Sequence, residues 1–245
     1  MRGRPCWFAR AVRPRTASGS GQRDTTLPTP VPEAVHYPSA GERRADRWVH
    51  TIGLTAGALG GVSLLGLSLG LGHPRQAPAI GVYAACLTVM FLASALYNLA
   101  SPQRRPLLRR FDHAAIFLMI AGSYTPFTTQ RLTGAWSIWM TAAVWALALA
   151  GAGGKLFLPG LGEGFWVVLY LALGWVAVAA IGPLIAGVSP AALALLLAGG
   201  RVYSAGVVIY LRKTLPFRRA IWHALVVAAA ATQFAAILIG VVLPG

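Results

Sequence analysis

The amino-acid sequence predicts an all-α, polytopic membrane protein, folded as a bundle of seven transmembrane helices. Hydrophobic residues make up 56% of the chain and charged residues only 11%, whereas soluble domains carry about 25% charged residues. From Trp48 onward the chain is a series of apolar segments, each close to the ~20 residues that a helix needs to cross a hydrocarbon core of roughly 30 Å. The alternating apolar and polar pattern of outer-membrane β-strands is absent from these segments.

Short connections separate the apolar segments, so we expect one compact helical membrane domain over residues 41–245. Glycine and alanine are abundant in the spans, and small residues let membrane helices approach one another closely. We place the spans at residues 48–71, 77–99, 112–130, 134–151, 164–186, 190–211 and 220–243.

The distribution of lysine and arginine predicts a cytoplasmic N-terminus and a C-terminus outside. Cations are concentrated before the first span, between spans 2 and 3, and between spans 6 and 7, with Lys155 between spans 4 and 5. The alternate connections hold only Arg75 and Arg131. Because cytoplasmic loops carry the excess of lysine and arginine, this alternation places the cation-rich connections inside, and it requires an odd number of spans.

Residues 1–40 form a region of different composition, which we expect to be a disordered basic tail that touches anionic lipid. It contains six arginines among prolines, serines and threonines, without the continuous apolar run of a secretory signal. The alternatives are an organelle transit peptide and an over-extended start site. The net charge of +15 does not indicate nucleic acid, because most cations lie in this tail and in loops that flank helices. Membrane lipids are the expected partners, and no protein partner is indicated.

Polar side chains from four spans gather at the predicted cytoplasmic end and form a candidate polar pocket. Residues spaced four apart share a helix face, as at the starts of spans 1 and 7 and the end of span 2. The alternative is that the ends of membrane helices are simply polar. The candidate pocket residues are Glu42, Asp46, His50, Ser94, Asn98, Asp112, His113, Arg219 and His223.

Five segments, in order and with matching spacing, resemble the hemolysin III family, the bacterial branch of the progestin and adipoQ receptor (PAQR) superfamily. The resemblance runs from about Glu42 to the C-terminus. It implies seven helices with the N-terminus inside, in a bacterial plasma (inner) membrane. The segments are Ser94-Ala95-Leu96-Tyr97-Asn98, Phe111-Asp112-His113-Ala114-Ala115-Ile116-Phe117, Ala121-Gly122-Ser123-Tyr124-Thr125-Pro126-Phe127, Ala198-Gly199-Gly200 with Tyr203-Ser204-Ala205-Gly206-Val207, and Ala220-Ile221-Trp222-His223.

The resemblance also implies a zinc site, with one histidine from span 2, two from span 7, and an aspartate in span 3 that holds metal-bound water. In this chain Asp112 and His223 match that pattern, but the other two histidine positions hold Asn98 and Arg219. Asn98 is a poor zinc ligand, and an arginine offers no lone pair. We therefore predict a degenerate, metal-free site in which His223 is the only retained ligand. A rearranged zinc site that uses His50 or His113 is the alternative.

Three charged residues outside this pattern have their own interpretations. Arg219 is hypothesised to replace the metal's charge by pairing with Asp112, the alternative being a topological arginine that reaches head groups. Arg201 lies near the middle of span 6, where it either lines a water-filled cavity or snorkels to the membrane surface. Glu163 stands in a glycine-rich connection, which we interpret as a solvated loop.

Three functions remain open at this point. The preferred one is a membrane sensor or lipid-homeostasis protein that performs no chemistry. The second, implied by the wider superfamily, is a zinc-dependent intramembrane hydrolase of a lipid amide, with Asp112 as the base for a metal-bound water. The third is a pore-forming protein, as the family name implies. The missing ligands at Asn98 and Arg219 lead us to expect no enzyme.

Overall fold

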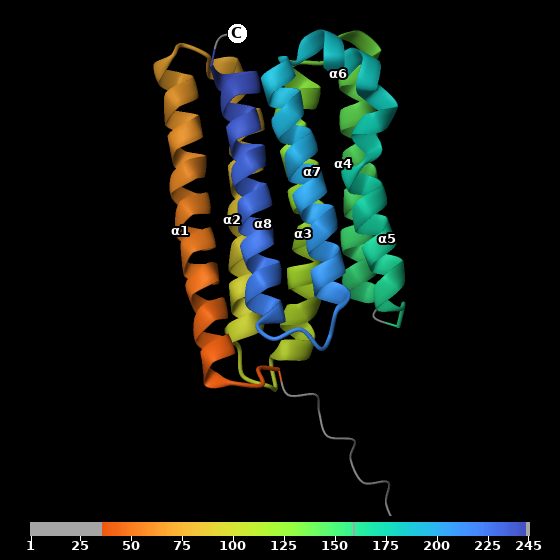
Figure 1. The fold of residues 1–245 in the computed structure, drawn as a ribbon. Coiled ribbons are helices and arrows are strands. Elements are labelled where there is room, and N and C mark those ends of the chain that lie inside the picture. Colours follow the sequence, from red (N-terminus) through yellow and green to blue (C-terminus); the bar gives the residue numbers. More distant parts are fainter. Residues whose placement is uncertain (1–35, 159, 244–245) are drawn as a thin grey trace, which may run out of the picture. The chain divides into compact units, whose positions relative to one another are not determined.

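The computed structural model describes residues 36–158 and 160–243, and within these ranges every regular element is helical (Figure 1). Residues 1–35, which hold most of the predicted basic tail, lie outside the described residues. The predicted all-α class is therefore confirmed for the described part of the chain. The elements are α1 (Ala40–Gly70), η1 (Pro74–Gln76), α2 (Ala77–Leu99), α3 (Arg105–Gln130), α4 (Gly134–Phe157), α5 (Glu163–Gly174), η2 (Val176–Ala180), α6 (Ile181–Gly187), α7 (Pro190–Leu211), α8 (Arg218–Ile237) and the π-helical turn η3 (Leu238–Val242).

Six helical segments of the described chain are long and apolar enough to cross a membrane: α1, η1 with α2, α4, α5 through α6, α7, and α8 with η3. Helix α3 has 26 residues, which is sufficient length. It is not among the six, because cations fill its first turns and hydroxyl residues its last ones.

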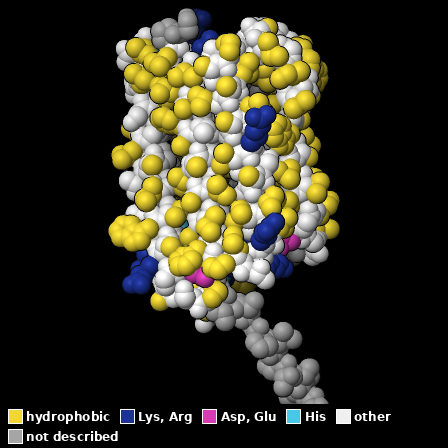
Figure 2. Space-filling model, in the orientation of Figure 1, with side chains coloured by type: hydrophobic (Ala, Val, Ile, Leu, Met, Phe, Trp, Pro, Cys, Tyr) yellow, Lys and Arg dark blue, Asp and Glu magenta, His cyan; other side chains and the backbone are white. Residues whose placement is uncertain are grey.

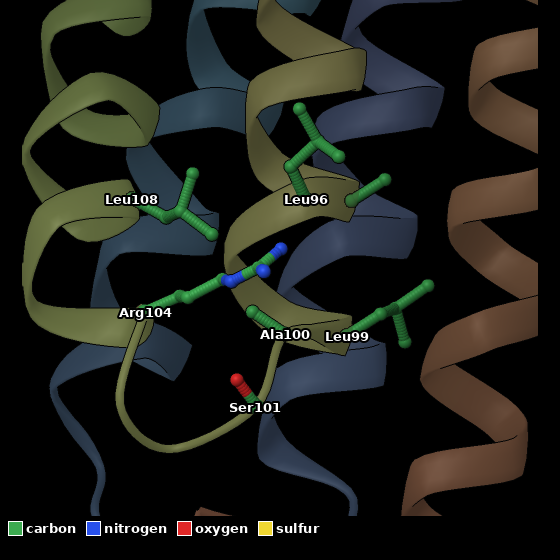
Figure 3. A pocket seen from close by; sticks show the side chains of 7 residues that line it. Leu96, Leu99, Ala100, Ser101, Arg104 and Leu108 are labelled. Carbon is green, nitrogen blue, oxygen red and sulfur yellow. The ribbon is translucent and has the colours of Figure 1, made fainter.

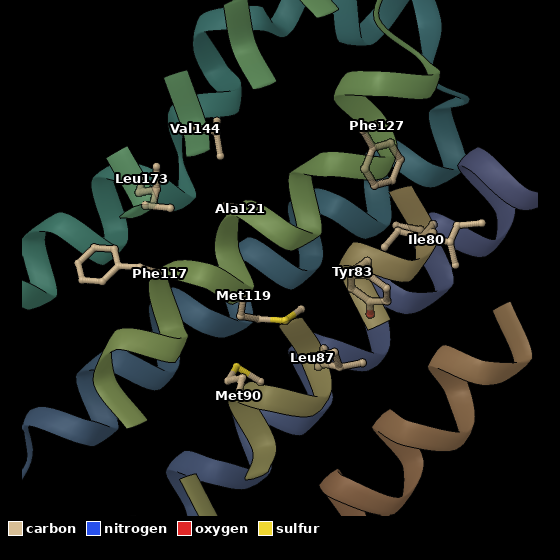
Figure 4. Close-up of a cluster of buried hydrophobic side chains, with 14 of the residues drawn as sticks. Ile80, Tyr83, Leu87, Met90, Phe117, Met119, Ala121, Phe127, Val144 and Leu173 are labelled. Atoms are coloured by element: carbon tan, nitrogen blue, oxygen red, sulfur yellow. The ribbon is translucent and has the colours of Figure 1, made fainter. Parts of the chain in front are cut away.

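Helix α3 lies inside the bundle, where its polar residues are sheltered by neighbouring helices. It packs along α2 and α4 over most of its length. Small residues allow this closeness: a Cβ on Gly122 would lie 2.6 Å from the Cβ of Cys86, and one on Gly151 would lie 2.5 Å from the Phe117 ring. Met119 of α3 points toward Leu87 and Met90 of α2 in the hydrophobic core (Figure 4).

The helices that contain the third and fourth predicted spans extend beyond the predicted bounds. Helix α3 begins at Arg105 rather than at residue 112, because Pro106 stands in the first turn, where its missing N–H costs no hydrogen bond. Asp112 and His113 consequently lie two turns inside the helix, and both are buried. Helix α4 continues to Phe157, past the predicted end at residue 151.

The fifth span is interrupted between α5 and α6 by the 3₁₀ turn η2. An interrupted helix leaves backbone groups that need partners within a membrane. Tyr124 of α3 supplies them, because its hydroxyl donates to the Gly174 carbonyl at 2.8 Å and accepts from the Ala177 N–H at 2.9 Å. One side chain thus stabilises the break and ties it to the central helix.

The polar helix ends meet at one end of the bundle, the lower end in Figure 1, where α1, α3, α5 and α8 begin and α2 and α7 end. On the face drawn in Figure 2 hydrophobic side chains are spread over the middle, where a few Lys and Arg side chains interrupt them, and the acidic side chains are at the lower end. Large apolar side chains such as Trp139, Phe157 and Val62 are more than two-thirds exposed, which fits a surface covered by lipid.

Candidate metal centre

Asp46, His50 and His223 form a compact cluster at the end of the bundle where α1 and α8 begin. One ligand atom from each residue lies within 4.8 Å of the others. Asp46 and His50 are four residues apart on α1, so they share the helix face that is turned into the bundle. Helix α1 begins at an N-cap in which the Ser39 side chain accepts a hydrogen bond from the Glu42 N–H. Asp46 is 0% and His50 4% exposed.

The Asp46 carboxylate joins α1 to α8 and to the segment before α1. His223 Nδ1 lies 2.6 Å from Asp46 Oδ1, and the Tyr37 hydroxyl donates to Asp46 Oδ2. Burial and the hydrogen bond to Asp46 raise the pKa of Tyr37 above its ordinary value, so Tyr37 stays protonated and remains a donor. Asp46 is therefore the acceptor at the centre of the cluster.

His50 is oriented so that one ring nitrogen keeps its lone pair and can act as an acceptor or a metal ligand. Its Nδ1 lies 2.8 Å from the Asp46 backbone carbonyl, which can only accept, so Nδ1 carries the proton. Nε2 then has the lone pair, and it faces Ser94 Oγ at 3.3 Å. Metal-binding histidines usually have this arrangement, with the second nitrogen donating to a carbonyl or carboxylate.

Ser94 connects the cluster to α2 and α3. Its hydroxyl is within hydrogen-bonding range of the Asp112 carboxylate, and Asp112 also lies within electrostatic range of His223. Asn98 donates from Nδ2 to the Ser94 carbonyl at 3.0 Å. Asn98 is 1% exposed, yet its Oδ1 has no hydrogen-bond partner among the described residues. A buried acceptor without a donor fits a site that takes up water or an ion.

The structure thus brings together Asp46, His50, Ser94, Asn98, Asp112 and His223 from the predicted pocket, and it places the other three residues at the margin. His113 turns toward the Tyr97 ring, at a centroid distance of 6.4 Å, and its Nε2 is 3.9 Å from Asp112. Arg219 lies over the Tyr37 ring, 5.9 Å from its centroid. Glu42 is half-buried in the first turn of α1. The pairing of Arg219 with Asp112 stays a prediction.

Tyr37 is a site residue that the sequence analysis missed. It lies nine residues before Asp46, within the range that composition assigned to the tail. An aromatic residue with a hydroxyl shortly before a membrane helix was the signal that could have identified it.

A second polar cluster corrects the interpretation of Glu163 as a solvated loop residue. Glu163 is the first residue of α5 and half-buried. Arg109 of α3 donates to it at 3.0 Å, and the Tyr210 hydroxyl of α7 donates to the same oxygen. Glu163 was misassigned because its partners are 54 and 47 residues away in sequence.

Arg201 is exposed at the middle of α7, and its side chain makes no hydrogen bond or ion pair with the described residues. It does not line an internal cavity with the cluster residues. It points away from the face of α7 that packs on α8, where Gly199 and Gly206 contact Thr232 and Trp222. Of the two predicted roles, the orientation favours a side chain that reaches toward the membrane surface.

The residues of the cluster fit a divalent metal. Two imidazoles and one carboxylate are a ligand set that zinc uses in catalytic sites, with water in the fourth position. The rearranged site foreseen from the sequence is available with His50, whereas His113 is turned away. The metal-free site stays a prediction, since the same groups also satisfy one another by hydrogen bonds.

Comparison with known proteins gives consistent matches over the membrane domain. The family described as haemolysin-III related matches residues 43–234. The hemolysin-3 homolog of Bacillus subtilis (strain 168) is 31% identical over 198 residues, covering 80% of this chain and 93% of the relative. Hemolysin-3 of Bacillus cereus is 35% identical over 161 residues, covering 65% of this chain and 74% of the relative. The human monocyte to macrophage differentiation factor is 29% identical over 167 residues, covering 64% of this chain and 67% of the relative.

Proposed function

The chain belongs to the haemolysin III family within the PAQR superfamily, and from this premise we propose that it is a zinc-dependent hydrolase of the bacterial plasma membrane that acts on a lipid amide. The observation that carries the proposal is the convergence of Asp46, His50 and His223 within 4.8 Å. The proposal includes seven spans, with α3 as the seventh, and an N-terminus in the cytoplasm.

In this proposal each residue of the cluster has a defined task. Asp46, His50 and His223 hold the ion, which when bound would supply Lewis-acid polarisation of water and of the substrate carbonyl. The Asp112 carboxylate, close to His223 and Ser94, accepts a proton from water. The Ser94 hydroxyl donates to the Asp112 carboxylate and orients it.

The charges at the two ends of the bundle support the proposed orientation. The end that carries the cluster also carries Arg43, Arg44 and Arg47 of α1, Arg104 and Arg105 before and in α3, and Arg212 and Lys213 after α7. Cations flank the cytoplasmic side of membrane helices, so the cluster would face the cytoplasm. A C-terminal alkaline phosphatase fusion should be active and a C-terminal fluorescent protein fusion dark.

A second candidate is a metal-free membrane sensor or lipid-homeostasis protein. The observation that favours it is that both oxygens of Asp46 already have partners, Tyr37 and His223. Such a network satisfies a buried carboxylate without an ion. In this case the cluster would only link α1 to α8.

Zinc analysis of detergent-purified protein separates the two candidates. The hydrolase proposal requires about one zinc per chain, lost in His50→Ala and in His223→Ala. His73→Ala is the matched control, because His73 lies after the opposite end of α1 and should leave the zinc content unchanged. If the purified protein held no zinc, or if both cluster variants kept their zinc, the hydrolase proposal would be wrong and the metal-free sensor would be favoured.

Activity is measured as release of fatty acid from a long-chain lipid amide in proteoliposomes. Asp112→Asn should retain zinc and lose activity about 100-fold or more, because general-base catalysis contributes that much. Equal activity in Asp112→Asn and wild type would contradict the assigned role. Ion flux recorded in the same vesicles tests pore formation, and it should equal that of protein-free vesicles.

A further inference from the structure

A hollow of about 410 Å³ lies between the end of α2 and the start of α3, beside the turn that connects them. Its lining is mostly apolar, from Ala95, Leu96 and Leu99 of α2 and Leu108 of α3, with Ser101 and Arg104 of the turn at its edge. Its volume falls in the range of pockets that hold small ligands, about 300–1,000 Å³. The hollow thus combines an apolar wall with a single cation.

The Arg104 side chain extends from the start of α3 across the hollow toward α2 (Figure 3). Leu96 and Leu108 lie on one side of it, and Ser101 on the other. Arg104 is exposed, and its guanidinium makes no hydrogen bond or ion pair within residues 36–158 and 160–243. Neighbouring Arg105 differs, since its Nε donates to the Ala100 carbonyl at 3.2 Å. Arg104 therefore offers its donors to a ligand.

The hollow opens on the outer surface of the bundle, away from the candidate metal centre. Leu96 is 51% exposed and Leu107, next to the hollow, 58%, whereas Ser94 and Asn98 on the same turns of α2 face the cluster. In a membrane the exposed leucines face acyl chains. Arg104 lies at the very end of the spans, which is the level of head groups.

We propose that this hollow binds one anionic glycerophospholipid. The guanidinium of Arg104 and the hydroxyl of Ser101 bind the phosphate, because arginine matches phosphate with two parallel N–H donors. An acyl chain lies along Leu96, Leu99 and Leu108. The inference is independent of the proposed function, because none of these residues belongs to the candidate metal centre of Asp46, His50 and His223.

The test measures lipid binding to the purified protein in detergent by native mass spectrometry. The probes are phosphatidylglycerol and phosphatidylcholine with identical acyl chains. We expect wild type to prefer phosphatidylglycerol. Arg104→Gln should weaken phosphatidylglycerol binding about tenfold and abolish the preference, because a charge-assisted hydrogen bond is lost. Arg44→Gln is the matched control: it removes an exposed arginine at the same end of the bundle that does not line the hollow, and it should change binding less than twofold.

A second variant tests the apolar wall. Ala95→Trp fills the hollow without changing charge and should weaken binding of both lipids, and retention of the wild-type thermal transition shows that it folds. Equal effects of Arg104→Gln and Arg44→Gln would overturn the proposal, as would equal binding of the two lipids by wild type. Displacement of the lipid by glycerol phosphate at equal concentration would also overturn it, since the acyl chain would then contribute nothing.

Discussion

Tyr124→Phe removes a single hydroxyl that serves two backbone groups at the break in the fifth span. The hydroxyl donates to the Gly174 carbonyl at 2.8 Å and accepts from the Ala177 N–H at 2.9 Å. Phenylalanine keeps the ring and its packing, so the change isolates these two hydrogen bonds. Within a membrane neither backbone group finds water as a replacement.

Each polar group left without a partner where water is excluded costs about 1–3 kcal/mol. Two such groups predict a loss of about 2–6 kcal/mol in the free energy of unfolding. Tyr170→Phe is the matched control, because the Tyr170 hydroxyl donates only to the His113 carbonyl at 3.0 Å. That carbonyl lies inside α3 and keeps its helical partner, so the control should lose about 1 kcal/mol.

The assay is equilibrium unfolding of the purified protein in mixed micelles, followed by tryptophan fluorescence and circular dichroism. Trp175 stands at the break itself and reports on this region. If Tyr124→Phe were no less stable than Tyr170→Phe, the tyrosine bridge would not be what stabilises the interrupted helix. The break would then have to be explained by the packing of η2 and α6 alone.

Three further predictions concern the site and the packing. Asn98→His should tighten zinc binding at least tenfold in chelator competition, because it restores a ligand beside the cluster, whereas Asn98→Ala should not; equal affinities would refute this. Gly187→Ala should cost about 2 kcal/mol or more in unfolding free energy, because its Cβ would lie 2.3 Å from the Arg131 carbonyl oxygen. Gly81→Ala is the control, because a Cβ there meets nothing within 4 Å. Equal stability of the two variants would contradict the close approach at Gly187. Glu163→Gln should lower the unfolding free energy by less than about 1 kcal/mol, since its ion pair is 35–47% exposed; a larger loss would show that this pair is shielded from solvent.

Much of the candidate site could be predicted from residue spacing. The four-residue interval between Asp46 and His50 places both side chains on one face of α1 wherever that helix forms. The resemblance carried by the segment around His223 added the histidine of α8. The prediction failed for Tyr37 and Glu163, because their partners lie on other elements and neither belongs to a periodic pattern.

The sequence by itself determined the helical membrane class and the end of the bundle where charge gathers. Both follow from local quantities, since the transfer free energy of a segment and the charge of a loop depend only on nearby residues. The tertiary structure alone decided that Asp46 meets His223, 177 positions away, and that Tyr124 stabilises the break before Ala177. These contacts depend on how each helix is rotated about its axis. That rotation is set by which small residues, such as Gly122 and Gly151, allow neighbouring helices to approach.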